Sequence, residues 1–332
     1  TLVNGEWQQE YTDNTTSVRV ESLEQCTSEE LAAQIETICQ EYQQGLSIEQ
    51  GDIIRVVLMK TSATEPRHRL MILVDHLAID GVSWRIILDQ LNQALIAIHQ
   101  DQTIDFGDKG TSYRQWQREL QSFSASKNII NQVPYWKSVV AAYEPLPVDR
   151  QATEVLMKDF KVHTIQLEED TTWALLKKVN QAYQTSIDDI LLSALAMTFG
   201  QWSGKENLVI GLEGHGRENI AEQIDTSETT GWFTNLYPVA LPTGKNTALG
   251  NLIKSTKEKM RSVPNKGIGY GALRFLHPSA DIRQRFAGQG WDVIFNYLGQ
   301  FDSISNANDY FRIADESTGA NSGGTMRVPV KM

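Results

Sequence analysis

The stretch DHLAIDGVSW spans residues 75–84 and decides how the first half of the chain is built. It continues from LMILVD (residues 70–75), whose apolar and β-branched side chains predict a buried strand. It leads into a run that repeats at the spacing of one helical face, namely Trp84, Leu88, Leu91, Leu95 and Ile98. We therefore expect a helix that begins at about Val82 or Ser83, with His76 in the loop between the strand and the helix.

The neighbouring segments extend this alternation of strands and helices. In the first half, alternating apolar residues predict a strand at 17–22, and the β-branched and apolar run at 53–61 predicts a buried strand. The helix between them starts at a capping box of Thr27 and Glu30. Spaced aromatic and leucine side chains predict a further helix around residues 113–123. Both strand and helix patterns are mixed along the chain, so the expected fold class is α/β.

Two prolines and weak periodicity mark residues 141–154 as a boundary, so we predict two lobes, at 1–145 and 146–332. A chain of 332 residues is long enough for two such cores, and a cleft between them is expected. In the second lobe, strands are predicted at 160–167, 208–214, 236–241 and 292–299, and helices at 169–183 and 186–203, the latter capped by Thr185 and Asp188.

The overall charge excludes some classes of partner. Acidic residues outnumber basic ones, which gives a formal net charge of -11 and a pI near 5.1. Nucleic acids and anionic membranes are unfavourable partners for such a surface, because it repels their phosphates. The apolar runs fall far short of the roughly 20 residues that span a bilayer, and the N-terminus carries no export signal. We expect a soluble protein of the cytoplasm that binds neither nucleic acid nor membrane.

Cysteine usage gives no sign of a metal site or a disulfide framework. Cys26 and Cys39 both lie in or beside the first predicted helix, which suits a reducing compartment. We expect no metal and no cofactor bound by the chain itself. The chain opens at Thr1 without a methionine and ends directly after the strand-like RVPVKM, so we expect it to be a segment of a longer protein.

His76 is the first candidate for chemistry, because a loop between a buried strand and a helix can present an imidazole in a cleft. Gly81 and the amide of Ser83, at the start of that helix, are candidates to bind a ligand oxygen. The plain alternative is a hydrogen-bonded structural histidine, since a single HxxxD match is weak evidence. Asp80 has two alternative roles, either orienting the histidine ring or pairing with an arginine that holds the loop, and we favour the pair.

The motif EGHGRE at residues 213–218 is the second candidate, because it places polar groups directly after a buried strand. Glu213 and Arg217 are its candidate site residues. The alternative is that these two side chains pair with each other and only hold a turn. Glycines on both sides of His215 indicate a tight backbone more than a histidine catalyst.

Two aromatic segments and a glycine-rich segment are the remaining candidate functional motifs. The segment TGWFTNLYPV (230–239) and the segment IFNYLGQFD (294–302) contain Trp232, Phe233 and Phe295, which we interpret as packing residues. Asn296 and Tyr297 differ, because an amide and a phenol can donate hydrogen bonds to a carbonyl oxygen in a pocket. The segment PNKGIGYG (264–271) predicts a mobile or closely approached loop without phosphate-binding spacing.

Taken in this order, DHLAIDGVSW, EGHGRE, TGWFTNLYPV, PNKGIGYG and IFNYLGQFD resemble the epimerization domains of nonribosomal peptide synthetases, from about Asn4 to the C-terminus. These belong to the condensation-domain superfamily, whose condensation members share the histidine motif but usually lack EGHGRE. The resemblance implies two chloramphenicol-acetyltransferase-like lobes, with mixed sheets and flanking helices, arranged as a V-shaped pseudo-dimer. We expect both lobes to be incomplete, the first at its start and the second at its end.

The resemblance also implies the reaction and the partners. The substrate would be an L-aminoacyl or peptidyl thioester on the phosphopantetheine arm of an upstream peptidyl carrier domain, among neighbouring synthetase modules. The α-proton would be removed and returned to give an L/D mixture, with His76 and Glu213 as the catalytic residues. Where the family has two adjacent histidines, this chain has Asp75 before His76, which we expect to alter the support of His76 and not the chemistry.

Three functions are therefore weighed for the chain. The first is a cofactor-independent amino-acid epimerase, the second is a condensation-type domain that forms a peptide bond between carrier-bound acyl groups, and the third is an inactive domain that only docks carrier domains. Glu213 favours the first over the second.

Overall fold

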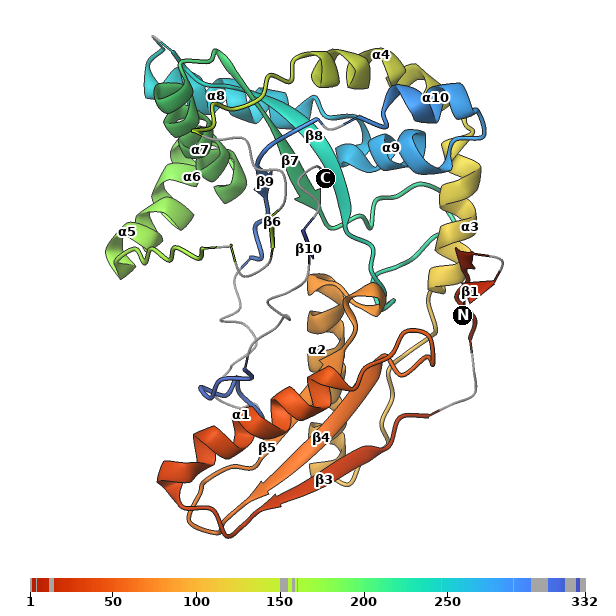
Figure 1. Ribbon diagram of the computed structural model, residues 1–332, viewed down its shortest axis with the longest axis vertical. Helices are drawn as coiled ribbons and strands as arrows, with labels where there is room; N and C mark the ends of the chain where they lie inside the picture. Colours follow the sequence, from red (N-terminus) through yellow and green to blue (C-terminus); the bar gives the residue numbers. More distant parts are fainter. Residues whose placement is uncertain are drawn as a thin grey trace.

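The structure is a computed structural model of the chain. It describes residues 2–3, 5–11, 15–149, 155–156, 159, 161–245, 247–288, 290–299, 310–319 and 327–328. Figure 1 shows two groups of elements, one around strands β3, β4 and β5 and the other around strands β7 and β8, with helix α3 running along one side. Each group is a mixed sheet with helices against it, which agrees with the expected α/β class.

The first lobe contains a three-stranded sheet of β3 (Val18–Leu23), β4 (Ile54–Thr61) and β5 (Arg69–Val74). Strand β4 lies in the middle, parallel to β3 and antiparallel to β5. Helix α1 (Ser28–Gln44) starts at the predicted capping box of Thr27 and Glu30 and packs on one face of this sheet. The buried residues of that layer are Leu23, Leu31, Ile35, Cys39, Val57 and Met59.

The second helix of this lobe, α2 (Gly81–His99), follows β5 through a single turn of 3₁₀ helix at His76–Ala78. Leu58, Leu70 and Ile72 alternate with the residues under α1, so they face the opposite side of the sheet. They line a cavity of about 1320 Å³ together with Trp84 and Leu88 of α2. The two helices therefore belong to different faces of the sheet.

The second lobe is built on the antiparallel pair β7 (Asn207–Gly214) and β8 (Asn235–Pro242), with the short β9 (Ile294–Phe295) parallel to β7. Helices α7 (Ile187–Ser203) and α8 (Leu249–Arg261) contact this pair and each other. The shared core consists of strand residues Leu208, Ile210, Leu212, Tyr237, Val239 and Leu241 with helix residues that include Leu192 and Ala196.

The helices between the two sheets pack on the second lobe. Helix α4 (Lys127–Ala141) contributes Ile129 and Trp136 to the core of that lobe, and helix α3 (Tyr113–Ser124) contacts the helical segment Ala272–Leu276. In the other direction, residues 310–319 reach back to the first lobe, where Glu316 pairs with Arg69 at 2.6 Å. A lobe boundary near residue 145 stays a prediction, because segments on each side of this position pack against the lobe on the other side.

The other described elements are short or peripheral: β1 (Leu2–Val3), β2 (Glu6–Trp7), β6 (Val155–Leu156), α5 (Glu169–Trp173), a π-helical segment (Ala174–Val179), α6 (Asn180–Tyr183), a 3₁₀ segment (Pro264–Gly267), α9 (Ile268–Gly271), α10 (Ala280–Arg285) and β10 (Arg327–Val328). The predicted loop at 264–271 begins with a kinked turn, in which Asn265 and Lys266 have left-handed backbone, and ends in the short helix α9. It is closely approached, because a Cβ at Gly267 would lie 2.0 Å from the Tyr237 ring.

Three sequence predictions about elements are wrong. Residues 161–167 form no strand, and the side chains of Val162 and Ile165 are 88% and 86% exposed, because no described strand pairs with this segment. Helix α7 is capped by Ser186 and Asp189, one residue later than predicted. Helix α2 starts at Gly81, slightly earlier than predicted, because the Asp80 side chain caps it.

Candidate functional site

His76 lies at the end of β5, in the one-turn 3₁₀ helix that joins β5 to α2. Asp75 precedes it, and its Oδ1 accepts a hydrogen bond of 2.9 Å from the amide of Leu77. Asp75 thus caps the turn that carries the histidine, which is the supporting position expected for it. The His76 side chain is exposed, as a group that meets a substrate must be.

Asp80 forms a buried ion pair with Arg217, which joins the first lobe to the second. Arg217 Nη2 lies 3.3 Å from Asp80 Oδ1 and 2.9 Å from Ser83 Oγ, and Nη1 donates to the carbonyls of Thr226 and Thr229 at 2.6 Å each. Asp80 is 3% exposed, so this pair is shielded from water. The ion pair expected for Asp80 is present, and it joins two of the motifs quoted from the sequence.

Ser83 belongs to the same hydrogen-bond network, and its amide is therefore not available to bind a substrate oxygen. Its backbone N–H and its hydroxyl both donate to Asp80 Oδ1 at 2.7 Å, and the residue is fully buried. The prediction that the Ser83 amide stabilises an oxyanion is therefore wrong, because the capping carboxylate occupies it. Gly81 lies before it at the exposed start of α2, where an added Cβ would meet nothing within 4 Å.

The motif EGHGRE separates its side chains through a turn at Gly216. That residue has φ +68°, and a Cβ there would lie 1.6 Å from the Phe233 carbonyl oxygen, so only glycine fits. Arg217 turns toward Asp80, while His215 Nε2 lies 3.1 Å from Glu218 Oε1. The alternative in which Glu213 and Arg217 hold a turn as a pair is wrong, since each has another partner.

Glu213 lies on β7 at the end that faces a cleft of about 760 Å³. Its Oε2 accepts a hydrogen bond of 2.6 Å from Asn296 Nδ2, just after β9. Tyr297 lines the same cleft, with Tyr237 and Phe295 among the other lining residues. Asn296 was expected to donate to a substrate carbonyl. One of its N–H groups is engaged by Glu213, so the substrate contact stays a prediction for the second.

Two acidic residues at the start of α7 add negative charge to this cleft. Asp188 and Asp189 both line it, and Asp189 caps the helix by accepting from the Ser186 amide. Burial, and then the neighbouring Asp189, raise the pKa of Asp188 above its usual value. Burial is also the main reason that the pKa of Tyr237 lies well above its usual value. Asp188 and Tyr237 are therefore partly shielded from water where they line the cleft, and electrostatic contacts are stronger in such surroundings.

Trp232 contacts His76 across the junction of the lobes, with ring centroids 5.2 Å apart and an interplanar angle of 62°. Trp232, Phe233 and Phe295 were all expected to be packing residues. Phe233 is buried at 2% exposure and Phe295 packs against the main core, but Trp232 is 41% exposed and lies outside any strand. The interpretation is wrong for Trp232. Trp232 lies between two residues that are hydrogen-bonded to the start of α2. The spacing of residues in the sequence does not reveal this position.

His76 and Glu213 belong to different lobes, and the segment between Trp232 and β8 connects their surroundings. Glu213 pairs with Leu236 in the β7–β8 ladder, and Leu236 is four residues from Trp232, which contacts His76. Four residues of extended chain span at most roughly 14 Å. Glu213 lines the cleft and His76 is not among its lining residues, so the action of the two side chains on a single bound molecule stays a prediction.

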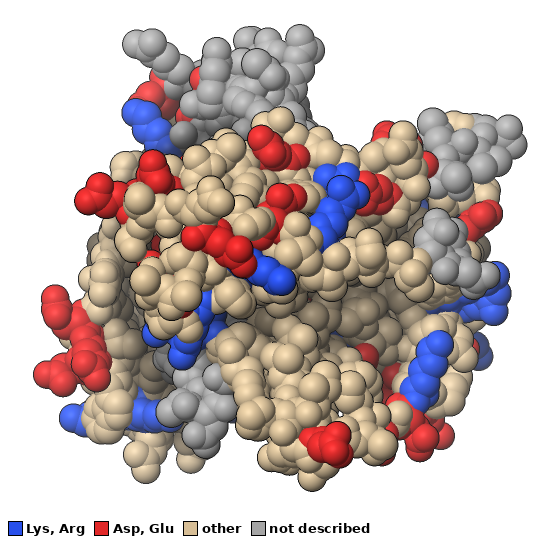
Figure 2. All heavy atoms as spheres, turned by 90° about the horizontal axis from the view of Figure 1, so that it is seen from below, with Lys and Arg blue, Asp and Glu red and all other residues tan. Residues whose placement is uncertain are grey.

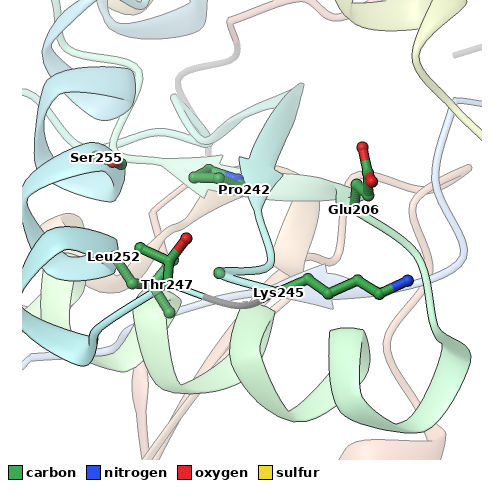
Figure 3. A pocket seen from close by; sticks show the side chains of 7 residues that line it. Glu206, Pro242, Lys245, Thr247, Leu252 and Ser255 are labelled. Atoms are coloured by element: carbon green, nitrogen blue, oxygen red, sulfur yellow. The ribbon is translucent and has the colours of Figure 1, made fainter.

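A separate pocket lies at the other end of the same strands. Figure 3 shows its residues, which include Glu206 just before β7, Pro242 at the end of β8, and Lys245. Its volume is about 450 Å³, and neither His76 nor Glu213 lines it. It belongs to the edge of the second lobe and not to the candidate site.

Charge at the surface, metal ligation and the length of apolar helices are three further properties of the described residues. Acidic and basic side chains are interspersed on the face seen in Figure 2. Among the described residues, no cluster of three or more histidine, cysteine, aspartate or glutamate side chains could hold a metal ion. Within the same residues, no helix combines the length and apolar character needed to cross a membrane.

Comparisons with known proteins agree on one family. The condensation-domain family matches residues 3–318. A component of the linear gramicidin synthase of Brevibacillus parabrevis is 41% identical over 308 residues, covering 91% of this chain and 6% of that protein. Tyrocidine synthase 1 of the same organism is 38% identical over 272 residues, covering 81% of this chain and 25% of that protein. The chain thus spans a small part of these relatives.

Solved structures give the same answer for the fold. The epimerization domain from the third module of tyrocidine synthetase B superposes with a TM-score of 0.83 at 30% identity, covering 96% of this chain and 70% of that one. The first condensation domain of the calcium-dependent antibiotic synthetase superposes with a TM-score of 0.62 at 15% identity, covering 84% and 58%. The second likeness concerns the fold alone.

Proposed function

Since the chain belongs to the condensation-domain family of nonribosomal peptide synthetases and has the acetyltransferase-like fold of an epimerization domain, we propose that it epimerizes the α-carbon of a carrier-bound amino acid. The substrate is an L-aminoacyl or peptidyl thioester on the phosphopantetheine arm of an upstream carrier domain, and the product is an L/D mixture. The observation that carries this proposal is the Glu213 carboxylate, which lines the cleft of the second lobe and is held there by Asn296, while His76 belongs to the first lobe.

The proposed reaction sets physical requirements for the two side chains. The α-proton of a thioester is a weak acid, so its removal needs a positioned base and stabilisation of the enolate oxygen. Inversion also needs a proton delivered to the opposite face of the α-carbon. A well-placed acid or base contributes roughly 10²- to 10⁴-fold, so positioning and oxyanion stabilisation supply much of the rest.

We assign His76 and Glu213 to the two faces of the α-carbon. His76 accepts the α-proton of the L-substrate, and Glu213 in its protonated form returns a proton on the other face. Because the product is a mixture, each group also acts in the reverse direction. Asn296 orients the Glu213 carboxylate, and the exposed first residue of α2, Gly81, leaves room for the thioester oxygen. Tyr297 is a second candidate donor to that oxygen.

A condensation-type transfer is the second candidate, favoured by the match of residues 3–318 to the condensation-domain family. In that reaction the same histidine would assist attack of an amine on a thioester, and no second proton donor would be needed. The two functions therefore differ in whether Glu213 is required. They also differ in whether the α-proton exchanges with water.

Deuterium uptake tests the proposal directly. The protein is incubated in D₂O with a carrier domain charged with an L-aminoacyl group, and the released amino acid is analysed by mass and by chirality. Deuterium at the α-carbon together with D-isomer supports epimerization. Formation of a peptide bond to a second charged carrier without α-exchange favours condensation. Carrier binding without either reaction favours a docking domain.

Variants assign the two roles. His76→Ala should abolish exchange, and Glu213→Gln should slow it by at least about 10²-fold or impair one direction, in line with the contribution of an acid or base. His163→Ala and Glu206→Gln serve as controls, because both residues lie outside the cleft. Full exchange in His76→Ala would refute the assignment of the base, and an unchanged rate in both directions would remove Glu213 from the mechanism.

A further inference from the structure

His76 contacts the aromatic ring of Trp232, although the two residues lie on different lobes. The ring centroids are 5.2 Å apart in an edge-to-face arrangement, which is a favoured geometry for aromatic pairs. No described hydrogen bond holds the imidazole, so the contact with Trp232 is the specific contact that defines where this exposed ring lies. The indole is itself 41% exposed, which is far more than packing in a core requires.

The backbone around Trp232 is fixed by residues of α2 and α3 and by the cap of α2. The amide of Gly231 donates to Ser83 Oγ at 3.1 Å, and the amide of Phe233 donates to Asp80 Oδ2 at 3.0 Å. Between them, the carbonyl of Trp232 accepts from the Tyr113 hydroxyl at 2.8 Å. Three consecutive residues are thus each bonded to these two helices or to the cap, so the direction of the Trp232 side chain is set by the same cap that starts α2.

This arrangement links the position of the base to the docking of the lobes. Asp80 caps the helix that follows His76, and it also holds Phe233 and pairs with Arg217. The Arg217 guanidinium lies over the Phe233 ring, 4.0 Å from its centroid, which fixes the next residue after Trp232. Any displacement of the segment 231–233 would therefore move the ring against which His76 packs.

We infer that Trp232 is a positioning residue for the reaction, whose indole packs edge-to-face with the His76 ring and holds it in the orientation that meets the α-proton. The inference rests on the proposed function and goes beyond it by giving the second lobe control over the base in the first. An aromatic face also stabilises a neighbouring cation, so it suits a histidine that becomes protonated during turnover. A side chain of similar size without a π face lacks both the edge-to-face geometry and this attraction.

The test compares Trp232→Phe with Trp232→Leu. With an L-aminoacyl thioester of pantetheine in D₂O, Trp232→Leu should lower kcat for α-exchange roughly 10- to 100-fold with little change in KM, as expected for a misplaced base. Trp232→Phe keeps an aromatic face and should retain most of kcat. Trp202→Leu is the matched control, because Trp202 is also exposed and also packs edge-to-face, on Phe199 at 5.8 Å, at the far end of α7.

A spectroscopic readout separates the inference from the proposed function. In protein labelled with ¹³C-histidine, the His76 ring resonance, assigned with His76→Ala, should move in Trp232→Leu and move less in Trp232→Phe, because a ring current acts at this distance. An unchanged His76 resonance, or equal exchange rates in wild type and Trp232→Leu, would overturn the inference. If the wild type exchanges no α-proton, the proposed function fails, and the resonance decides the contact alone.

Discussion

At the scale of single residues, the candidate site depends on two glycines with opposite requirements. Gly216 has φ +68° and no room for a Cβ, because the Phe233 carbonyl lies against its Cα. Gly81 has open space around it, at the exposed first residue of α2. The first glycine is required by the fold, whereas the second is a candidate for approach by a substrate.

Substitution by alanine should separate these two roles. Gly216→Ala should destabilise the protein by about 2 kcal/mol or more, since it combines a left-handed backbone with a steric clash. Gly81→Ala should leave the free energy of unfolding unchanged or slightly higher, because alanine favours a helix over glycine. Denaturant unfolding measures both, and α-exchange should fall in Gly81→Ala if a substrate oxygen approaches this position. Equal loss of stability in the two variants would contradict this account.

At the scale of elements, the short strand β9 is held at its start by the segment that follows α4. The Tyr143 hydroxyl donates to Asp292 Oδ1 and the Leu146 amide donates to Asp292 Oδ2, both at 2.8 Å. Asp292 comes two residues before β9, which in turn leads to Asn296 and Tyr297. Asn296 and Tyr297 thus follow a strand whose start is held by these two hydrogen bonds.

This contact predicts a dependence of stability on alkaline pH. Burial, and then the hydrogen bond to Asp292, raise the pKa of Tyr143 to about 12 from an ordinary value of 10.0. The folded state binds the phenol proton more tightly than the unfolded state does. Tyr143 therefore contributes fully to the free energy of unfolding below pH 10, and this contribution is lost as the pH rises to about 12. The free energy of unfolding, measured across this pH range, should decline less in Tyr143→Phe than in the wild type. Parallel curves for the two proteins would rule out this role of Tyr143.

At the scale of the whole molecule, the lobes are joined by a buried charge pair. Arg217 on the second lobe contacts Asp80 and Ser83 on the first and also binds two carbonyls of its own lobe. A buried ion pair adds little net stability compared with apolar residues, but removing one partner leaves a desolvated charge. We therefore expect this pair to fix the relative position of the lobes.

Removal of the guanidinium should accordingly be costly. Arg217→Met should lower the free energy of unfolding by about 3–5 kcal/mol, because Asp80 is left buried without its cation. The double variant Asp80→Asn with Arg217→Met should lose less than the sum of the two single losses. Denaturant unfolding of the four proteins measures this coupling, and additive losses would show that the two side chains do not interact. Arg217→Lys should not restore stability fully, since lysine lacks the planar fork.

Most of the helices and strands and the two candidate catalytic residues are predictable from the amino-acid sequence. The strands β3, β4, β5, β7 and β8 and the helices α1, α2, α3 and α7 were predictable because period-2 and period-3.6 patterns reflect local burial. His76 and Glu213 were identified by their place at the ends of buried strands and by the family resemblance of their motifs. The conformation of segment 161–167 was not predicted correctly, because a strand also needs a partner strand that its own residues do not specify.

The contacts between side chains that are distant in the sequence depend on the tertiary structure. Arg217 could have paired with Glu213 or with Asp80, and Asn296 could have faced a substrate or Glu213, since each choice lies between residues far apart in the sequence. Trp232 looked like a packing residue until the bonds at Gly231, Trp232 and Phe233 placed it against His76. Hydrogen-bond geometry and burial at the junction of two lobes depend on how the lobes dock, and docking has no local pattern along the chain.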